Sequence, residues 1–139
     1  MKLLLIGLFA LLMGIPSQSE NGSTLKKESQ PKLKTYYFHG ERRCFTCNSI
    51  EKHTKTTMEK YFAEEIKNGT ITFEVINIDK PENKGIAKKF KVYSSSLIVE
   101  KKVKAGYEKI NLTNFAFMYG KNKEKYITEL KKKIEGLLK

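Results

Sequence analysis

Cysteine is scarce in this chain, and tryptophan is absent. The 139 residues contain two cysteines, three prolines, nine glycines and no tryptophan. Two cysteines are too few for a disulfide scaffold or an all-cysteine zinc site. So little proline and glycine also excludes a collagen-like or low-complexity chain. With 40% hydrophobic residues, the sequence predicts a folded protein of one domain.

Negative charge is also in short supply. The chain has 15 Asp and Glu residues against 27 Lys and Arg residues, which gives a net charge of +12. The lysines are spread along the sequence and do not cluster with aromatic residues, so we expect a solvated surface and no nucleic-acid partner. Peripheral contact with an anionic membrane surface or an acidic protein stays an alternative. We expect a monomer without a bound cofactor.

The longest apolar run, residues 3–15, is too short for a permanent membrane anchor, which needs about 20 apolar residues. The run follows Lys2 and ends before Pro16, as in a secretory signal peptide. We therefore predict a signal peptide at 1–19, cleaved near Ser19, and export to the periplasm or the exterior. An uncleaved anchor or a buried core helix is the alternative interpretation.

The remaining sequence divides into a linker and one domain. Residues 20–33 are polar and lack apolar periodicity, which indicates a flexible linker, and residues 34–139 form the domain. Apolar periodicity predicts strands at 33–38, 71–78, 96–102 and 107–112, and helices at 44–67, 82–90 and 123–138. This order predicts an α/β sandwich with a mixed sheet of about four strands flanked by helices.

Two finer expectations concern the middle of the chain. The segment 71–78 is nearly apolar throughout, which favours a central position in the sheet. Asp79 follows it and is expected to cap the helix at 82–90, with Pro81 near the first turn.

The two cysteines form a Cys-x-x-Cys motif where the first predicted helix begins. Positions three apart share one face of a helix, so the sulfurs of Cys44 and Cys47 can reach each other. The free backbone N–H groups and the positive end of the helix dipole favour a thiolate at Cys44, and the charges of Arg42 and Arg43 act in the same direction. Because the thiolate is the nucleophile in disulfide exchange, the motif predicts a redox pair.

Two other interpretations of the cysteines stay open. They could form an inert structural disulfide, although so short a loop removes little entropy from the unfolded chain. They could instead bind a soft metal such as Cu(I) together with His39. Zinc would need two further ligands, and the only histidines are His39 and His53. We expect His53 to be a surface or partly buried residue.

The sequence around the motif resembles a known family. The segments 36–40 (Tyr-Tyr-Phe-His-Gly) and 43–47 (Arg-Cys-Phe-Thr-Cys), followed by 75–79 (Val-Ile-Asn-Ile-Asp), are similar to the thioredoxin-like ArsF-type family. That family is named as a small subunit associated with nitrophenyl-compound nitroreductase. The resemblance covers roughly residues 34–139 and implies a thioredoxin-like fold with a redox dithiol.

The chain departs from thioredoxins themselves at two places. Thioredoxins carry a tryptophan before the first motif cysteine and a cis-proline opposite the dithiol. Here residues 92–97 contain no proline, and Ser95 or Ser96 is expected beside the dithiol. Since that proline also keeps metals away from the cysteines, its absence leaves the metal alternative open.

We therefore predict an exported protein that exchanges thiols and disulfides with a partner protein. Cys44 and Cys47 are the predicted catalytic residues: Cys44 attacks and Cys47 resolves the mixed disulfide. No metal or cofactor site is assigned. A soft-metal binding protein or chaperone that uses the same cysteines, and a non-catalytic interaction module, are the alternatives.

Overall fold

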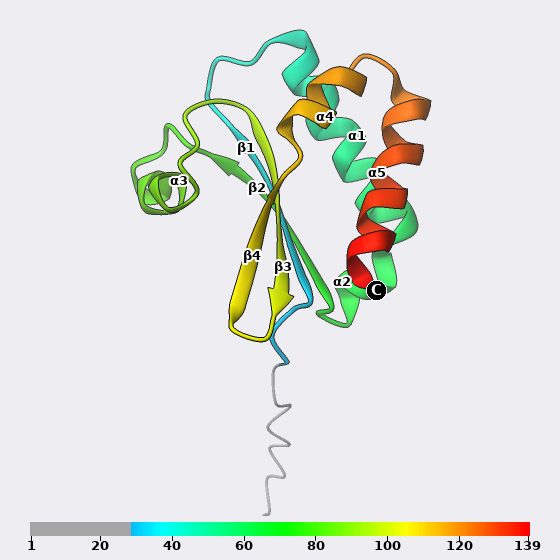
Figure 1. Ribbon diagram of the computed structural model, residues 1–139. Helices are drawn as coiled ribbons and strands as arrows, with labels where there is room; N and C mark the ends of the chain where they lie inside the picture. The colour runs from blue at the N-terminus through cyan, green and yellow to red at the C-terminus, as the bar shows by residue number, and fades with distance from the viewer. Residues whose placement is uncertain (1–28) are drawn as a thin grey trace, which may run out of the picture.

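The computed structural model describes residues 29–139 (Figure 1). The expected signal peptide at 1–19 and the linker up to residue 28 lie outside the described residues. Residues 29–32 have no helix or strand, and β1 begins at Leu33, whose side chain is fully buried. Within the described part of the chain, no helix is long and apolar enough to cross a membrane.

The elements follow one another in the order that the periodicity predicts, with additions. They are β1 (Leu33–His39), α1 (Phe45–Tyr61), α2 (Ala63–Lys67), β2 (Ile71–Asn77), the 3-10 helix η1 (Pro81–Asn83), α3 (Lys84–Phe90), β3 (Ser96–Val103), β4 (Gly106–Asn111), α4 (Thr113–Tyr119) and α5 (Lys123–Leu138). The last helix has the predicted bounds, because its apolar side chains recur every three or four residues without interruption.

The four strands form one mixed sheet in the order β2-β1-β3-β4. β1 runs parallel to β2 and antiparallel to β3, and β3 and β4 form a hairpin. Helices α1, α4 and α5 lie on one side of the sheet, and α3 lies on the other (Figure 1). The predicted α/β sandwich with a four-stranded mixed sheet flanked by helices is confirmed.

Each face of the sheet has its own core, because side chains alternate between the faces of a strand. Tyr37 of β1 belongs to the larger core, with residues of α1, α4 and α5. Its neighbours Tyr36 and Phe38 belong to the smaller core, with Phe90 of α3. β1 is therefore buried on both faces. The residues that follow it are held at a fixed place at the C-terminal end of this central strand.

The prediction that 71–78 is a central strand is wrong. β2 pairs with β1 alone and forms one edge of the sheet. Val75 is 39% exposed, and only Ile71 and Ile76 of this strand are buried. The central positions belong to β1 and β3, and the apolar side chains of β2 pack against helices without a second neighbouring strand.

The predicted first helix is two helices. It breaks at Phe62, whose φ of −131° is not helical and whose side chain is only 2% exposed. Its backbone N–H still donates to Met58 O over 3.0 Å, so α1 closes normally before α2 begins. The break places the Phe62 ring in the larger core, where its burial stabilises the fold.

The prediction that Asp79 caps a helix is also wrong. The residue before η1 is Lys80, and Asn83 precedes α3 without a side-chain hydrogen bond to its N-terminus. The carboxylate of Asp79 instead accepts a hydrogen bond of 2.8 Å from the backbone N–H of Glu41. Asp79 therefore ties the end of β2 to the loop that leads into α1.

Candidate functional site

Cys44 is the N-cap residue of α1. Its sulfur accepts a hydrogen bond of 3.0 Å from the backbone N–H of Cys47, which is one of the N–H groups that a helix leaves without an internal partner. The first turn of α1 contains no acidic residue. The end of the helix therefore presents uncompensated positive charge to this sulfur, as the sequence predicted.

Cys44 and Cys47 form a disulfide, with Cα atoms 5.1 Å apart. The two cysteines differ in exposure: Cys44 is exposed to solvent, whereas Cys47 is only 8% exposed. A thiol from another molecule can thus approach Cys44 more readily than Cys47. This asymmetry is what an attacking and a resolving cysteine require.

The disulfide lies in a surface cleft of about 710 Å³. The loop after β1 forms one wall, with Gly40, Glu41 and Arg42, and the loop before β3 forms the other. Tyr93, which is 87% exposed, and Phe117 of α4, which is 42% exposed, border the same cleft. The cleft is open enough to receive a segment of another polypeptide beside the sulfurs.

The sequence-based placement of a serine beside the dithiol fits the structure. Ser94 and Ser95 line the cleft together with both cysteines, and Ser96 starts β3. Ser95 also influences Tyr37: burial raises the pKa of Tyr37, to which Glu51 adds, while the Ser95 hydroxyl and Arg43 oppose the rise.

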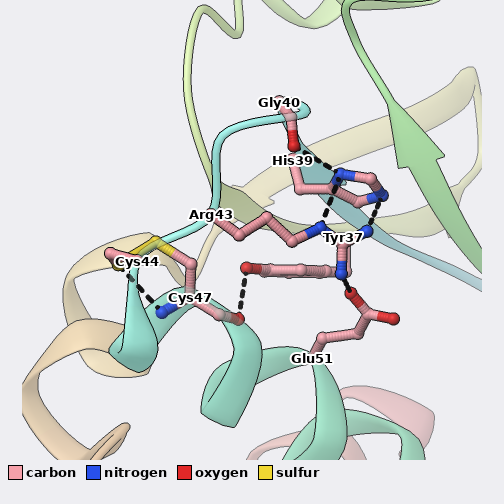
Figure 2. Close-up of polar contacts among 7 residues, drawn as sticks. All are labelled: Tyr37, His39, Gly40, Arg43, Cys44, Cys47 and Glu51. Atoms are coloured by element: carbon pink, nitrogen blue, oxygen red, sulfur yellow. Dashed lines mark hydrogen bonds and ion pairs between the residues drawn. A yellow bond between two sulfur atoms is a disulfide. The ribbon is translucent and has the colours of Figure 1, made fainter.

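Tyr37 contacts the backbone of Cys47. Its hydroxyl donates a hydrogen bond of 2.8 Å to the carbonyl oxygen of Cys47, and its ring is fully buried (Figure 2). The bond joins β1 of the sheet to the first turn of α1. A buried hydrogen bond between strand and helix therefore holds Cys47, and with it the disulfide, in position.

Arg43 does not contribute its charge to the sulfurs as the sequence suggested. Its side chain extends away from the disulfide, where the guanidinium contacts both ring nitrogens of His39 and pairs with the carboxylate of Glu51 (Figure 2). Since Glu51 neutralises this guanidinium, Arg43 acts chiefly by fixing the loop to α1. Arg42 remains exposed at the cleft, where Glu41 and Asp79 also lie.

His39 is not arranged as a metal ligand for the cysteines. Its Nδ1 lies 2.9 Å from the carbonyl oxygen of Gly40, and its Nε2 meets the guanidinium of Arg43. The ring is 6% exposed and lies on the far side of Arg43 from the sulfurs (Figure 2). Within residues 29–139, no three His, Cys, Asp or Glu side chains gather where they could hold a metal ion.

The expectation that His53 is a surface or partly buried residue is wrong, because its side chain is buried among the helices. His53 of α1 is 8% exposed and packs against the ring of Tyr126, with ring centroids 5.6 Å apart. Its Nδ1 has no hydrogen-bond partner among the described residues. Burial lowers the pKa of His53, and the charges of Lys123 and Lys52 add to this effect.

Sequence reasoning missed two kinds of residue at this site. Tyr37 was assigned to a strand without a role beneath Cys47, because strand periodicity alone does not show which tyrosine faces the helix. Phe117 was missed because α4 was not predicted. The sequence held a signal for α4: Asn111 is followed by the apolar residues 115–119, and Gly120 ends them.

Comparison with known proteins finds distant similarity to solved structures. No family model matches the chain, and no curated protein matches it. A solved structure described as that of a malarial protein is 18% identical, covers 63% of this chain and 93% of its own, and has a TM-score of 0.41. The solution structure of a thioredoxin from Thermus thermophilus is 14% identical, covers 73% of this chain and 72% of its own, and has a TM-score of 0.46.

The fold assignment rests on the chain's own topology. A β2-β1-β3-β4 mixed sheet lies between helices, and a disulfide-bonded Cys-x-x-Cys begins the helix after β1. This arrangement agrees with the thioredoxin-like fold that the sequence resemblance implies.

Proposed function

We propose that the protein exchanges disulfides with thiols of a partner protein through Cys44 and Cys47. The observation that supports this proposal most directly is the disulfide between an exposed cysteine at the N-cap of α1 and a buried cysteine one turn later. The exposed sulfur lies in a cleft large enough for a peptide segment. The resemblance to the ArsF-type family agrees with a dithiol function, and membership of that family remains part of the proposal.

The exchange has two balanced steps. A partner thiolate attacks Sγ of Cys44; the new sulfur–sulfur bond forms as the Cys44–Cys47 bond breaks, and Cys47 leaves as a thiolate. A second partner thiolate then attacks the partner's own sulfur in the mixed disulfide, and Cys44 leaves as a thiolate. The partner dithiol loses two electrons and becomes a disulfide, while the cysteine pair gains them. The reverse sequence uses the same atoms.

The helix N-terminus lowers the cost of the charge that forms at Cys44. The thiolate keeps the hydrogen bond from the N–H of Cys47 and lies at the positive end of α1. Cys47 is held by the bond from Tyr37 to its carbonyl oxygen. Its sulfur therefore stays within reach of Cys44 during the mixed-disulfide stage.

A single-turnover experiment tests this proposal. The oxidised protein is mixed with reduced ribonuclease, quenched with acid, alkylated and weighed by mass spectrometry. We expect one substrate disulfide for each Cys44–Cys47 disulfide consumed. With Cys47→Ser, a mixed disulfide through Cys44 should accumulate when the substrate carries an activated disulfide, whereas Cys44→Ser should trap little because Cys47 is buried. A wild-type rate no higher than that of the Cys44→Ser, Cys47→Ser double variant contradicts the proposal.

We also propose that the domain works outside the cytoplasm. The support is the sequence of residues 1–19, where a short apolar run follows Lys2 and ends before Pro16. The mass of the protein purified from its source organism should correspond to a chain that starts at Glu20. An intact N-terminus would contradict cleavage.

A further inference from the structure

One end of the molecule, opposite the disulfide, carries a cluster of lysines around one exposed and two partly buried apolar side chains. A shallow cavity of about 400 Å³ there is lined by Lys32, Lys101, Lys102, Lys104 and Lys139. Val103, Leu137 and Leu138 lie between these lysines. We call these eight residues the basic end.

Three segments that are distant in sequence form the basic end. The backbone N–H of Lys102 donates to the carbonyl oxygen of Lys32 over 2.8 Å, which joins the β3–β4 hairpin to the start of β1. The C-terminus of α5 lies beside them. Figure 1 shows the start of β1, the hairpin turn and the C-terminus at one end of the sheet, and the loop into α1 at the other.

The five lysines of the basic end form no ion pair with a carboxylate among the described residues. None of its five lysines has a carboxylate of residues 29–139 within the 4.0 Å of an ion pair, and the C-terminal carboxylate of Lys139 is the one negative group within the cluster itself. Glu108 faces Lys101 across the hairpin without pairing with it. The nearby Glu100 is buried and pairs with Lys89.

The apolar members distinguish the basic end from an ordinary solvated surface. Val103 is 39% exposed at the tip of the hairpin, directly between Lys102 and Lys104. Leu137 and Leu138 are partly buried. Lysines around a small apolar tip are the combination that binds a lipid surface: the ammonium groups meet anionic headgroups, and the apolar side chain enters the boundary below them.

We propose that the basic end docks on an anionic lipid surface. The positive charge complements the headgroups, and the hairpin tip supplies a small apolar contact. The proposal rests on the described lysines and holds whether or not the cysteines exchange disulfides.

Docking at this end fixes the orientation of the disulfide. β1 runs from the basic end to the loop before Cys44, and its seven residues span about 20 Å. The cleft then faces away from the lipid and stays accessible to a soluble partner protein.

Vesicle sedimentation of the full chain tests the proposal. Binding is measured to vesicles of equal parts phosphatidylcholine and phosphatidylglycerol and to vesicles of phosphatidylcholine alone, and the ratio of the two partition coefficients is compared among variants. The ratio cancels any contribution of residues 3–15 that does not depend on lipid charge. We expect a ratio well above one for the wild type, which falls at least tenfold in K101Q/K102Q/K104Q, since each lysine near such a surface contributes roughly fivefold.

The matched control removes the same charge elsewhere. K80Q/K84Q/K88Q changes three exposed lysines around η1 and α3 and should leave the ratio within about twofold of the wild type. In 1 M salt, where the screening length falls to about 3 Å, the wild-type ratio should approach one. If K101Q/K102Q/K104Q is poorly folded by circular dichroism, K32Q/K139Q serves as the second variant and should lower the ratio severalfold.

Three results overturn the proposal. The first is a wild-type ratio near one. The second is an equal fall in the two triple variants, which would show only the effect of net charge. The third is loss of heparin retention in K101Q/K102Q/K104Q with an unchanged vesicle ratio, which would assign the basic end to an acidic macromolecule instead.

Discussion

The hydroxyl of Tyr37 donates a hydrogen bond of 2.8 Å to the backbone carbonyl of Cys47, and this bond links the central strand β1 to the first turn of α1. It lies entirely inside the protein, because the tyrosine side chain is fully buried. Burial raises the pKa of Tyr37, so the hydroxyl keeps its proton and remains a donor over the usual pH range.

Tyr37→Phe should lower the free energy of unfolding by about 1–2 kcal/mol, because the ring still fills its place while the hydrogen bond is lost. Urea denaturation of the oxidised protein measures the change. Tyr93→Phe is the control: that ring is 87% exposed, so we expect a change within about 0.5 kcal/mol. Equal effects of the two variants would show that the bond to Cys47 adds nothing to stability.

Substitutions of Arg43 and Glu51, which form an ion pair, should have non-additive effects on the free energy of unfolding. Their side chains are 27% and 26% exposed, and Arg43 also contacts His39. We expect Arg43→Gln to cost about 1–3 kcal/mol of unfolding free energy, and the double variant with Glu51→Gln to cost at least about 0.5 kcal/mol less than the sum of the single changes.

A double-mutant cycle by chemical denaturation measures this coupling. The control is Lys55→Gln, which breaks the exposed pair with Glu59 and should change stability by less than about 1 kcal/mol. Strict additivity of Arg43→Gln and Glu51→Gln would mean that the loop before Cys44 is held by other contacts.

Two glycines should respond in opposite directions to alanine. A Cβ at Gly120 would lie 2.9 Å from Ala116 O, Ile50 Cγ1 and Thr46 Cγ2, and one of these is backbone. Gly120→Ala should therefore destabilise the protein by about 1–3 kcal/mol. Gly136 in α5 has no atom within 4 Å of an added Cβ, so Gly136→Ala should stabilise it by about 0.5–1 kcal/mol. Thermal denaturation distinguishes the two, and a destabilising Gly136→Ala would contradict the open space at that position.

His53 should make the protein less stable in acid. Burial lowers its pKa in the folded state below the ordinary value of 6.5, so the unfolded chain binds a proton that the folded chain does not. The loss begins as the pH falls through 6.5 and is complete below the lowered pKa. Within that window the unfolding free energy should fall by up to about 1.4 kcal/mol per pH unit.

Denaturation of the wild type and of His53→Gln is measured from about pH 8 to about pH 5, a range that includes the ordinary pKa of histidine. The comparison isolates the contribution of His53, because the other titratable groups are common to both proteins. The stability difference between the two proteins should shrink or reverse as the pH falls. Parallel curves would show that His53 titrates alike in the folded and unfolded chain.

The sequence alone predicted the elements whose buried face is defined by the pattern of neighbouring residues. Residues 123–138 carry an unbroken helical stripe, and Tyr126, Leu130 and Ile134 of that stripe are fully buried in α5. Cys44 and Cys47 were likewise placed correctly at the start of a helix, because strand periodicity ends at His39 and helical periodicity follows the motif.

Properties that depend on distant partners could not be predicted from one sequence. An apolar strand such as β2 can gain its burial from helices or from a second strand, and only the packing of the whole domain decides between them. Asp79 has the composition of a helix cap, but the N–H of Glu41, 38 residues away, is its partner. Arg43 was expected to act on its sequence neighbour Cys44, whereas Glu51 on the next turns of α1 attracts its charge.

The hydrogen bond from the Cys47 N–H to Cys44 Sγ bears on the energetics of the proposed disulfide exchange. The donor is a backbone amide of the same helical turn, so it is already in place when the sulfur is oxidised and is the group that a thiolate at that sulfur would need. The oxidised and reduced proteins can therefore share one backbone conformation. In the proposed exchange the surroundings of the sulfurs would then need little rearrangement, and only the bonds between sulfurs would change.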